Sequence, residues 1–292
     1  MRLKNVLNLF TSTYILFSWC RLHLLLILVA RFVLCTHVCG ERQWDYLVYS
    51  LEWPPTYCFT HTCKLPYNIN NFNIHGLWPS IWPSGSPTNC PNHMPFEIDT
   101  IKPIYTELQK EWANLDDFDD PKAFWKHEWQ KHGVCALSDP IISNELDYFN
   151  ISLIMKSKVN LLRRLESIKI IPSDSVTLKR DVLLNQLKKL FNVDVLMYCF
   201  LIHHKPAKLA EIRLCLNPSM EFISCPSSIH NIDDYHHHHH HYKYESFSSS
   251  FSKNILDNFV CQSQLPWINQ STNCLLHSNA PCPDELIFPD FN

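Results

Sequence analysis

Apolar and polar positions divide the chain beyond residue 40 into strands, then helices, then strands again. The two kinds of residue alternate over residues 44–55 and in a shorter run over 72–80, which is the period of a β-strand. From about residue 99 to 170 the apolar residues recur at helical spacing and predict several helices. A further helix is predicted over 173–191, where Ser and Asp supply candidate N-caps.

Three strand-like runs follow at 193–202, 210–216 and 220–225, separated by polar or proline-containing turns. Strands on both sides of a block of helices favour an α+β domain over repeated βαβ units. After Cys225 the regular pattern fades, and no internal repeat is found.

A low-complexity insert rich in His and Ser occupies about 230–253 and contains six consecutive histidines, His236–His241. Such a run could give weak binding of divalent metal, or of polyanions in acid. The alternatives are an exposed loop with no specific role or an introduced tag, although the internal position argues against a tag.

The first 40 residues form a separate segment that predicts a signal peptide. A basic start precedes apolar runs, of which Leu24–Ala30 is the longest uninterrupted one. Arg21 and Arg31 flank this run, which is far shorter than the roughly 20 apolar residues of a membrane span. A secretory signal is therefore favoured over a transmembrane anchor. Its cleavage would leave one domain over about 41–292, without a stable membrane anchor.

The cysteines indicate an oxidising compartment. Three of the 13 fall in the predicted signal peptide, and the remaining ten are an even number, which favours five disulfides. Counting alone does not give their pairing, and no CxxC pair occurs after the leader, so zinc ligation is not favoured. Two glycosylation acceptors, Asn150 and Asn269, fit the same compartment.

Charge adds an indication of the working pH. The whole chain has a formal net charge of −3, and the predicted signal peptide holds basic but no acidic residues, so the remaining domain is more acidic still. Most of the 17 histidines lie in that domain and would become charged in mild acid. A polyanion would be repelled at neutral pH and tolerated in acid, which suggests an acidic working compartment.

The stretch "FWKHEWQKHGVC", residues 124–135, combines ionisable and aromatic residues. The zinc-protease pattern requires His-Glu-x-x-His, and here the second histidine comes one residue later. An ordinary surface helix with an aromatic core stripe explains the tryptophans but not the histidines and glutamate opposite. At about 100° per residue, one flank carries His127, Glu128, Lys131 and His132, and the other Trp125 and Trp129.

A second histidine-bearing stretch, "FNIHGLWPS", contains His75. A lone histidine of this kind is more often structural, but the two stretches together resemble the two active-site segments of the ribonuclease T2 family, the acid endoribonucleases of secretions, vacuoles and lysosomes. Residues 51–58 and 210–226 resemble other parts of the family. The resemblance implies a single α+β domain with a central antiparallel sheet, flanking helices and disulfide bonds.

The chemistry of RNA cleavage agrees with these residues. A base must take the proton of the 2′-hydroxyl, an acid must protonate the departing 5′-oxygen, and positive charge must surround the phosphorus. Two histidines can hold opposite protonation states in mild acid. The resemblance implies His132 as general base, His75 as general acid, His127 as phosphate ligand, and Lys131 and Glu128 as transition-state stabilising or orienting groups.

The resemblance further implies single-stranded RNA as substrate, 2′,3′-cyclic phosphate ends followed by 3′-phosphates, and no metal or other cofactor. DNA should resist because it lacks the attacking hydroxyl. Trp78 matches a position that stacks on a base, with a buried core tryptophan as the alternative. Ser80 and Glu52 depart from the residues common at their positions, so the base preference is left open.

The family also suggests disulfide pairs: Cys58 with Cys63, Cys90 with Cys135, Cys215 with Cys225 and Cys199 with Cys261, which leaves Cys274 with Cys282. We expect a monomer that is secreted or resides in a lysosomal or vacuolar lumen. One competing hypothesis is a secreted glycoprotein that acts mainly by binding, with nuclease activity incidental or used after uptake. Another is a metal-dependent hydrolase that uses the histidine run.

Overall fold

The computed structural model describes residues 42–65, 69–83, 85–87, 90, 94–139, 141–202, 205–226 and 275–291. Apart from Arg42, these belong to one compact unit, Gln43–Asn292. The predicted signal peptide, the insert at 230–253 with its histidine run, and the acceptor Asn269 lie outside the described residues.

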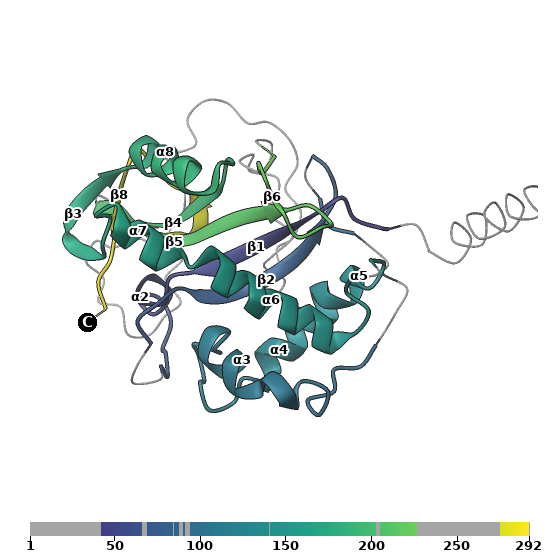
Figure 1. Cartoon of the computed structure of the whole chain (residues 1–292). Helices are drawn as coiled ribbons and strands as arrows, with labels where there is room; N and C mark the ends of the chain where they lie inside the picture. Colours follow the sequence, from purple (N-terminus) through teal and green to yellow (C-terminus); the bar gives the residue numbers. More distant parts are fainter. Residues whose placement is uncertain are drawn as a thin grey trace, which may run out of the picture. The chain divides into compact units, whose positions relative to one another are not determined.

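A single sheet forms the centre of this unit, with the strand order β2-β1-β5-β4-β7 (Figure 1). Neighbours along this path are antiparallel, as predicted, whereas the short strand β8 runs parallel to β5. The strands are β1 Tyr46–Glu52, β2 Asn73–Ser80, β3 Ser173–Lys179, β4 Leu196–Ile202, β5 Lys205–Leu216, β6 Phe222–Ile223, β7 Leu275–Pro281 and β8 Glu285–Phe288.

The helices lie mostly between β2 and β4 in the chain, as the sequence predicts. In Figure 1, α6 and α7 run across the front of the sheet, while α3, α4 and α5 lie below β2. Within the described part, no helix is long and apolar enough to cross a membrane. The helices are α2 Pro54–Tyr57, η1 Lys102–Ile104, α3 Tyr105–Glu111, α4 Lys122–Glu128, η2 Trp129–Gly133, α5 Val134–Ala136, α6 Glu145–Val159, α7 Leu161–Ser167 and α8 Arg180–Phe191.

The two faces of the sheet differ because side chains alternate along each strand. In β1, Leu47, Tyr49 and Leu51 belong to the main apolar core, and the Tyr49 hydroxyl donates to the Ser152 carbonyl of α6 at 3.0 Å. The alternate positions, which include Ser50 and Glu52, face the other way. This second face carries the buried polar groups described below.

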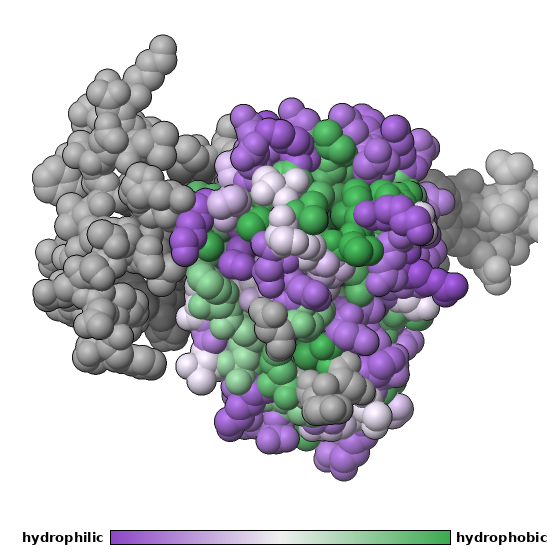
Figure 2. Space-filling model, turned by 90° about the vertical axis from the view of Figure 1, so that its left-hand side faces the viewer, coloured by the Kyte–Doolittle hydropathy of each residue, from purple (hydrophilic) through white to green (hydrophobic). Residues whose placement is uncertain are grey.

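The prediction of one helix over 173–191 is wrong at its start. Residues 173–179 form β3, which pairs with β8, and the helix begins at Arg180. Most of β3 is exposed, so its sequence lacks the alternation of a half-buried strand. Figure 2 faces the side of the molecule on which β3 lies, and its surface mixes hydrophobic and hydrophilic residues. Val176 of β3 and Val182 of α8 are both more than half exposed.

Strands β7 and β8 were not predicted either. The sequence of β7, "LLHSNAP", groups its polar residues in the middle instead of alternating them with apolar ones and ends in proline, and β8 has only four residues. These two segments are extended because β7 pairs with β4 and β8 pairs with β3 and β5, not because their own residues favour a strand.

Four disulfides occur in the described part of the chain. Three agree with the predicted pairs, Cys58–Cys63, Cys90–Cys135 and Cys215–Cys225. The predicted bonds from Cys199 to Cys261 and from Cys274 to Cys282 are both wrong, because Cys199 is bonded to Cys282. Pairing of β7 with β4 brings the end of β7 alongside Cys199, and the two Cα atoms are 4.8 Å apart. Cys261 and Cys274 lie outside the described residues.

Candidate active site

A β-bulge in β2 sets the direction of His75. Ser50 of β1 pairs with Gly76, and the next residue, Leu51, pairs with Ile74, so His75 is the extra residue in β2. Bulges bend a strand and redirect a side chain. Ile74 stays in the main core, while the His75 side chain remains 29% exposed.

Next to the bulge, Gly76 allows the helix that carries the second motif to approach β2. A Cβ atom at Gly76 would lie 2.1 Å from Trp78 Nε1 and 2.4 Å from Glu128 Oε2. These two atoms are joined by a hydrogen bond, because the Trp78 indole donates to the Glu128 carboxylate at 2.9 Å. Only glycine fits this contact.

The second motif is not one continuous α-helix, as the 100° spacing assumed. The α-helix α4 ends at Glu128, a π turn follows over Trp129–Gly133, and α5 continues from Val134. A π turn closes its hydrogen bond over five residues instead of four, so it reduces the angular separation of residues five apart, such as His127 and His132. Single π turns inside helices are frequent at functional sites.

The aromatic flank of this helix is buried in the core, as predicted. Trp125 and Trp129 are fully buried, and each indole donates to a carbonyl, at Trp112 and Met94 respectively. A Cβ atom at Gly133 would lie 2.3 Å from the Trp129 ring. The tryptophans therefore fix the rotation of the helix about its axis.

The polar flank lies at the exposed edge of the core. Glu128 and His132 are buried, and the His132 ring lies 5.4 Å from the Trp78 ring. His127 and Lys131 are exposed on the same segment. The centre of the His75 ring lies 5.0 Å from the centre of the Trp78 ring. The indole of Trp78 thus connects the two predicted motifs.

Glu211, on β5, belongs to the site but was not singled out in the sequence. His75 Nδ1 donates to Glu211 Oε1 at 2.6 Å, and the Glu211 side chain is 2% exposed. The signal was present in the alternation of 210–216, where Glu211 and Arg213 share one face of an otherwise apolar strand. That face also holds Ser50 and Glu52, which pair with Arg213 and Glu211 respectively.

These neighbours change the protonation of His75. Burial alone would lower the pKa of the imidazole, but the charge of Glu211 and the hydrogen bond to it dominate and raise the pKa to about 9. Burial would raise the pKa of Glu211, yet Arg213 and His75 hold it well below its ordinary value. His75 is therefore protonated and Glu211 ionised at neutral pH.

Other groups of the site shift in different directions. Burial raises the pKa of Glu52 to about 7 and also raises that of Glu128. Partial desolvation of the His127 ring by its neighbours, together with the charges of Lys131 and His75, lowers the pKa of His127. In mild acid the site thus combines a charged His75 with a His127 that loses its proton more easily than a free histidine.

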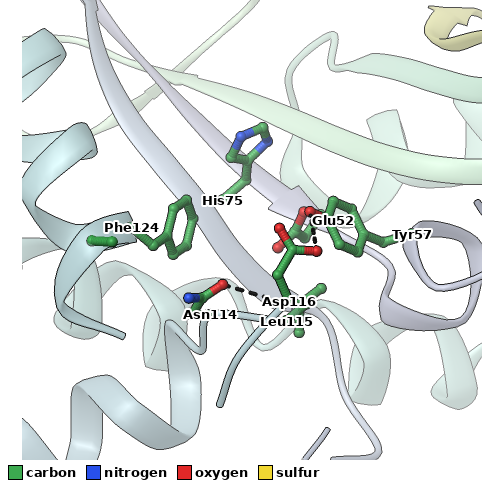
Figure 3. Close-up of a pocket in the computed structure, with 8 residues that line it drawn as sticks. Glu52, Tyr57, His75, Asn114, Leu115, Asp116 and Phe124 are labelled. Carbon is green, nitrogen blue, oxygen red and sulfur yellow. Dashed lines mark hydrogen bonds between the residues drawn. The ribbon is translucent and has the colours of Figure 1, made fainter. Parts of the chain in front are cut away.

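A cavity of about 260 Å³ opens beside His75 (Figure 3). The rings of Phe124 and Tyr57 lie on opposite sides of it. The Tyr57 hydroxyl donates to Asp116 Oδ1 at 3.0 Å, and the Asn73 amide donates to Glu52 Oε1 at 2.8 Å. The remaining lining residues are Asn114, Leu115 and Ala123. Aromatic rings beside hydrogen-bonding groups suit a planar, polar ligand such as a nucleobase.

Glu52, His75 and Glu211 are a possible set of metal ligands, because each has one ligand atom within 4.8 Å of the ligand atoms of the other two. Arg213 already supplies a cation to Glu211, with Nε and Nη2 at 2.8 and 2.7 Å from Oε2. A metal ion would have to compete with this guanidinium and displace the proton on His75 Nδ1.

The predicted substrate-binding residue Trp78 has little free surface. Its side chain is 5% exposed, and the Arg213 guanidinium lies 4.9 Å from its ring centre. Ser80, another position considered for base selection, is buried and donates to the Trp78 carbonyl at 3.1 Å. The glycosylation acceptor Asn150 is exposed on α6. Trp78 packs in the buried cluster on the second face of the sheet, and its role in base stacking stays a prediction.

Comparison with known proteins identifies the class. The family model "Ribonuclease T2 family" matches residues 44–225. Ribonuclease Oy from Magallana gigas is 37% identical over 188 residues, which cover 63% of this chain and 88% of that protein. The crystal structure of human RNase T2 is 26% identical, covers 63% of this chain and 91% of its own, and has a TM-score of 0.54.

An RNase MC1 mutant in complex with 5′-UMP is similar as well, with 27% identity, a TM-score of 0.56, and coverage of 63% of this chain and 93% of its own. The chain belongs to the ribonuclease T2 family. It is an endoribonuclease, and its α+β fold is the one that the sequence predicts.

Proposed function

We propose that the protein cleaves single-stranded RNA without a metal, first to 2′,3′-cyclic phosphate ends and then to 3′-phosphates. The observation that carries the proposal is the hydrogen bond from His75 Nδ1 to the buried Glu211 carboxylate, with the His75 ring 6.3 Å from Phe124 on the helix that bears the second histidine pair. A histidine that keeps its proton at neutral pH is suited to act as an acid and unsuited to act as a base.

In this mechanism His132 takes the proton of the 2′-hydroxyl as that oxygen attacks phosphorus. His75 donates a proton to the departing 5′-oxygen. His127 and Lys131, which are exposed, bind the phosphate oxygens, where their positive charge stabilises the five-coordinate transition state. Each such contact contributes on the order of 3 kcal/mol to lowering the barrier.

Glu128 has a supporting role in this proposal. Its carboxylate is buried and accepts the Trp78 indole N–H, so it cannot reach far into solvent. We assign it to orienting Trp78 and the neighbouring histidines, and to balancing the positive charge of His75 and Lys131. Trp78 then acts as the connection between the two motifs, and base stacking falls to the rings of the cavity.

The cavity between Phe124 and Tyr57 holds a nucleotide next to the scissile phosphate in this proposal. It adjoins His75, and its rings can contact either face of a base. Glu52 and Asp116 add hydrogen-bond acceptors when they are ionised. The base preference is left open.

The first test is digestion of single-stranded RNA and of DNA with the same sequence at about pH 5, in the presence of a chelator. Cyclic-phosphate ends on RNA alone, identified by mass spectrometry, are the expected result. His132→Phe should abolish cleavage, and a biological effect that persists in this variant would favour the binding hypothesis. Cleavage that the chelator stops would overturn the metal-independent mechanism.

We also propose that the protein is a monomer that is secreted or held in a lysosomal or vacuolar lumen. Four disulfides in the described residues support an oxidising compartment. Residues 1–40 as a signal peptide, glycosylation of Asn150 and Asn269, and weak metal binding by the histidine insert are further parts of this proposal. Sequencing the N-terminus of the protein exported by a cell tests the first of them.

A further inference from the structure

Glu211 is a buried carboxylate, and both of its oxygens accept hydrogen bonds from neighbouring side chains. Oε1 accepts the His75 Nδ1 proton, and Oε2 accepts from Arg213 and from the Ser50 hydroxyl at 3.0 Å. A carboxylate with this many donors stays ionised and keeps one orientation. Its position at the middle of β5, a strand paired on both sides, makes it rigid as well.

The partners of Glu211 are fixed in turn. The Arg213 guanidinium lies 4.1 Å from the ring centre of Tyr198 and 4.9 Å from that of Trp78, so it is stacked between two aromatic side chains. His75 and Glu211 are far apart in the sequence, at a separation of 136 positions. A contact of this geometry restrains the imidazole both in orientation and in the location of its proton.

We propose that Glu211 is the positioning residue for His75: by holding Nδ1–H, it directs Nε2, with its transferable proton, toward the departing 5′-oxygen. This inference rests on the proposed function, in which His75 is the general acid. The bond from phosphorus to the 2′-oxygen forms as the bond to the 5′-oxygen breaks. The proton of the 2′-hydroxyl passes to His132, and the proton on His75 Nε2 passes to the 5′-oxygen.

Charged groups from three elements face His75 and set its titration together. Glu52 on β1, Glu128 on α4 and Glu211 on β5 favour the imidazolium, whereas His127, when protonated, opposes it. Glu211 contributes more than the other carboxylates, because it alone adds a hydrogen bond to the charge. Replacing Glu211 should therefore lower the pKa of His75 even with the other two carboxylates present.

The test uses two substrates that differ in the leaving group. A dinucleotide releases a ribose 5′-oxygen, which needs a proton, whereas a nitrophenyl ester of uridine 3′-phosphate releases a phenolate, which does not. We expect Glu211→Gln to lower kcat on the dinucleotide at least about tenfold with little change in KM, and to leave the aryl ester nearly unaffected. The alkaline limb of the pH profile should move to lower pH.

Controls separate the possible failures. His75→Ala should show the same substrate selectivity, and full activity of that variant on the dinucleotide would overturn the proposed role of His75 itself. An inactive His75→Ala with an unaffected Glu211→Gln would overturn only the positioning role. Equal losses on both substrates would assign Glu211 to structure alone. Glu166→Gln, which changes an exposed carboxylate on α7, is the matched control.

A measurement on the unaltered protein covers the case in which Glu211→Gln does not fold. Nuclear magnetic resonance of the His75 ring should show a strongly downfield Nδ1 proton and an imidazole that titrates well above the ordinary histidine range. A ring that titrates normally, with no such proton, would overturn the proposal.

Discussion

At the scale of single residues, Gly76 determines whether the two motifs can meet. The hydrogen bond from Trp78 to Glu128 occupies the space where a side chain at Gly76 would begin. Neither the buried indole nor the buried carboxylate has room to move away without leaving a polar group unpaired, which costs about 1–3 kcal/mol.

We therefore expect Gly76→Ala to lower the free energy of unfolding by at least about 2 kcal/mol and RNA cleavage by about tenfold or more. Gly85→Ala is the control, because its added Cβ would meet Ile81 only at 3.9 Å and should be tolerated. Thermal unfolding and a cleavage assay measure the two effects. A Gly76→Ala protein that melts and cleaves like the original would show that Trp78 and Glu128 need not be in contact.

At the scale of elements, the site depends on two local departures from regular structure. The bulge in β2 directs His75, and the π turn η2 rearranges the ionisable residues of the second motif. The disulfide Cys90–Cys135 joins the segment immediately after this π turn to the loop beyond β2. It thus restrains the position of His132.

Replacing both Cys90 and Cys135 by serine should lower stability and activity together. The chain-entropy model gives about 4 kcal/mol for a bond across 45 residues and about 2 kcal/mol for Cys58–Cys63, which spans 5. The Cys58→Ser, Cys63→Ser protein is therefore the matched control, with a smaller loss of melting temperature. Equal melting temperatures of the two variants would contradict this prediction, as would full activity of the Cys90, Cys135 variant.

At the scale of the whole molecule, stability depends on pH because several side chains have a higher pKa in the folded protein than in the unfolded chain. Glu145 at the start of α6 is 4% exposed, and its Oε1 has no hydrogen-bond partner among the described residues. Burial raises the pKa of this carboxyl to about 7. The raised pKa of Glu52 and His75 acts in the same direction, and the lowered pKa of His127 acts in the opposite one.

A raised pKa means that stability from Glu145 is complete below the ordinary glutamate value and is lost as the pH rises through about 7. We expect the protein to lose on the order of 2 kcal/mol through this group between pH 5 and 8. Glu145→Gln should flatten that part of the stability curve, as measured by denaturant unfolding at several pH values. Parallel curves for the two proteins would rule out this role of Glu145.

The sequence by itself determined most of the order of strands and helices and the two motifs that identify the family, and the family resemblance supplied three of the disulfide pairs. These features depend on local patterns: alternation in β1 and β2, helical spacing before β4, and histidines beside aromatic residues. Side chains buried by one element leave such a pattern, because each element must present an apolar face to the core. Where burial is slight, as in β3, or the strand is short, as in β8, the pattern was missing and the prediction failed.

Only the tertiary structure decided how the site is assembled. Glu211 contacts His75 because β5 pairs with β1 and β1 pairs with β2, and Cys199 bonds to Cys282 because β7 pairs with β4. The bulge at His75 and the π turn after Glu128 likewise arise where neighbouring elements pack together. Contacts between residues far apart in the chain depend on strand register and helix packing, and a local sequence pattern does not contain that information.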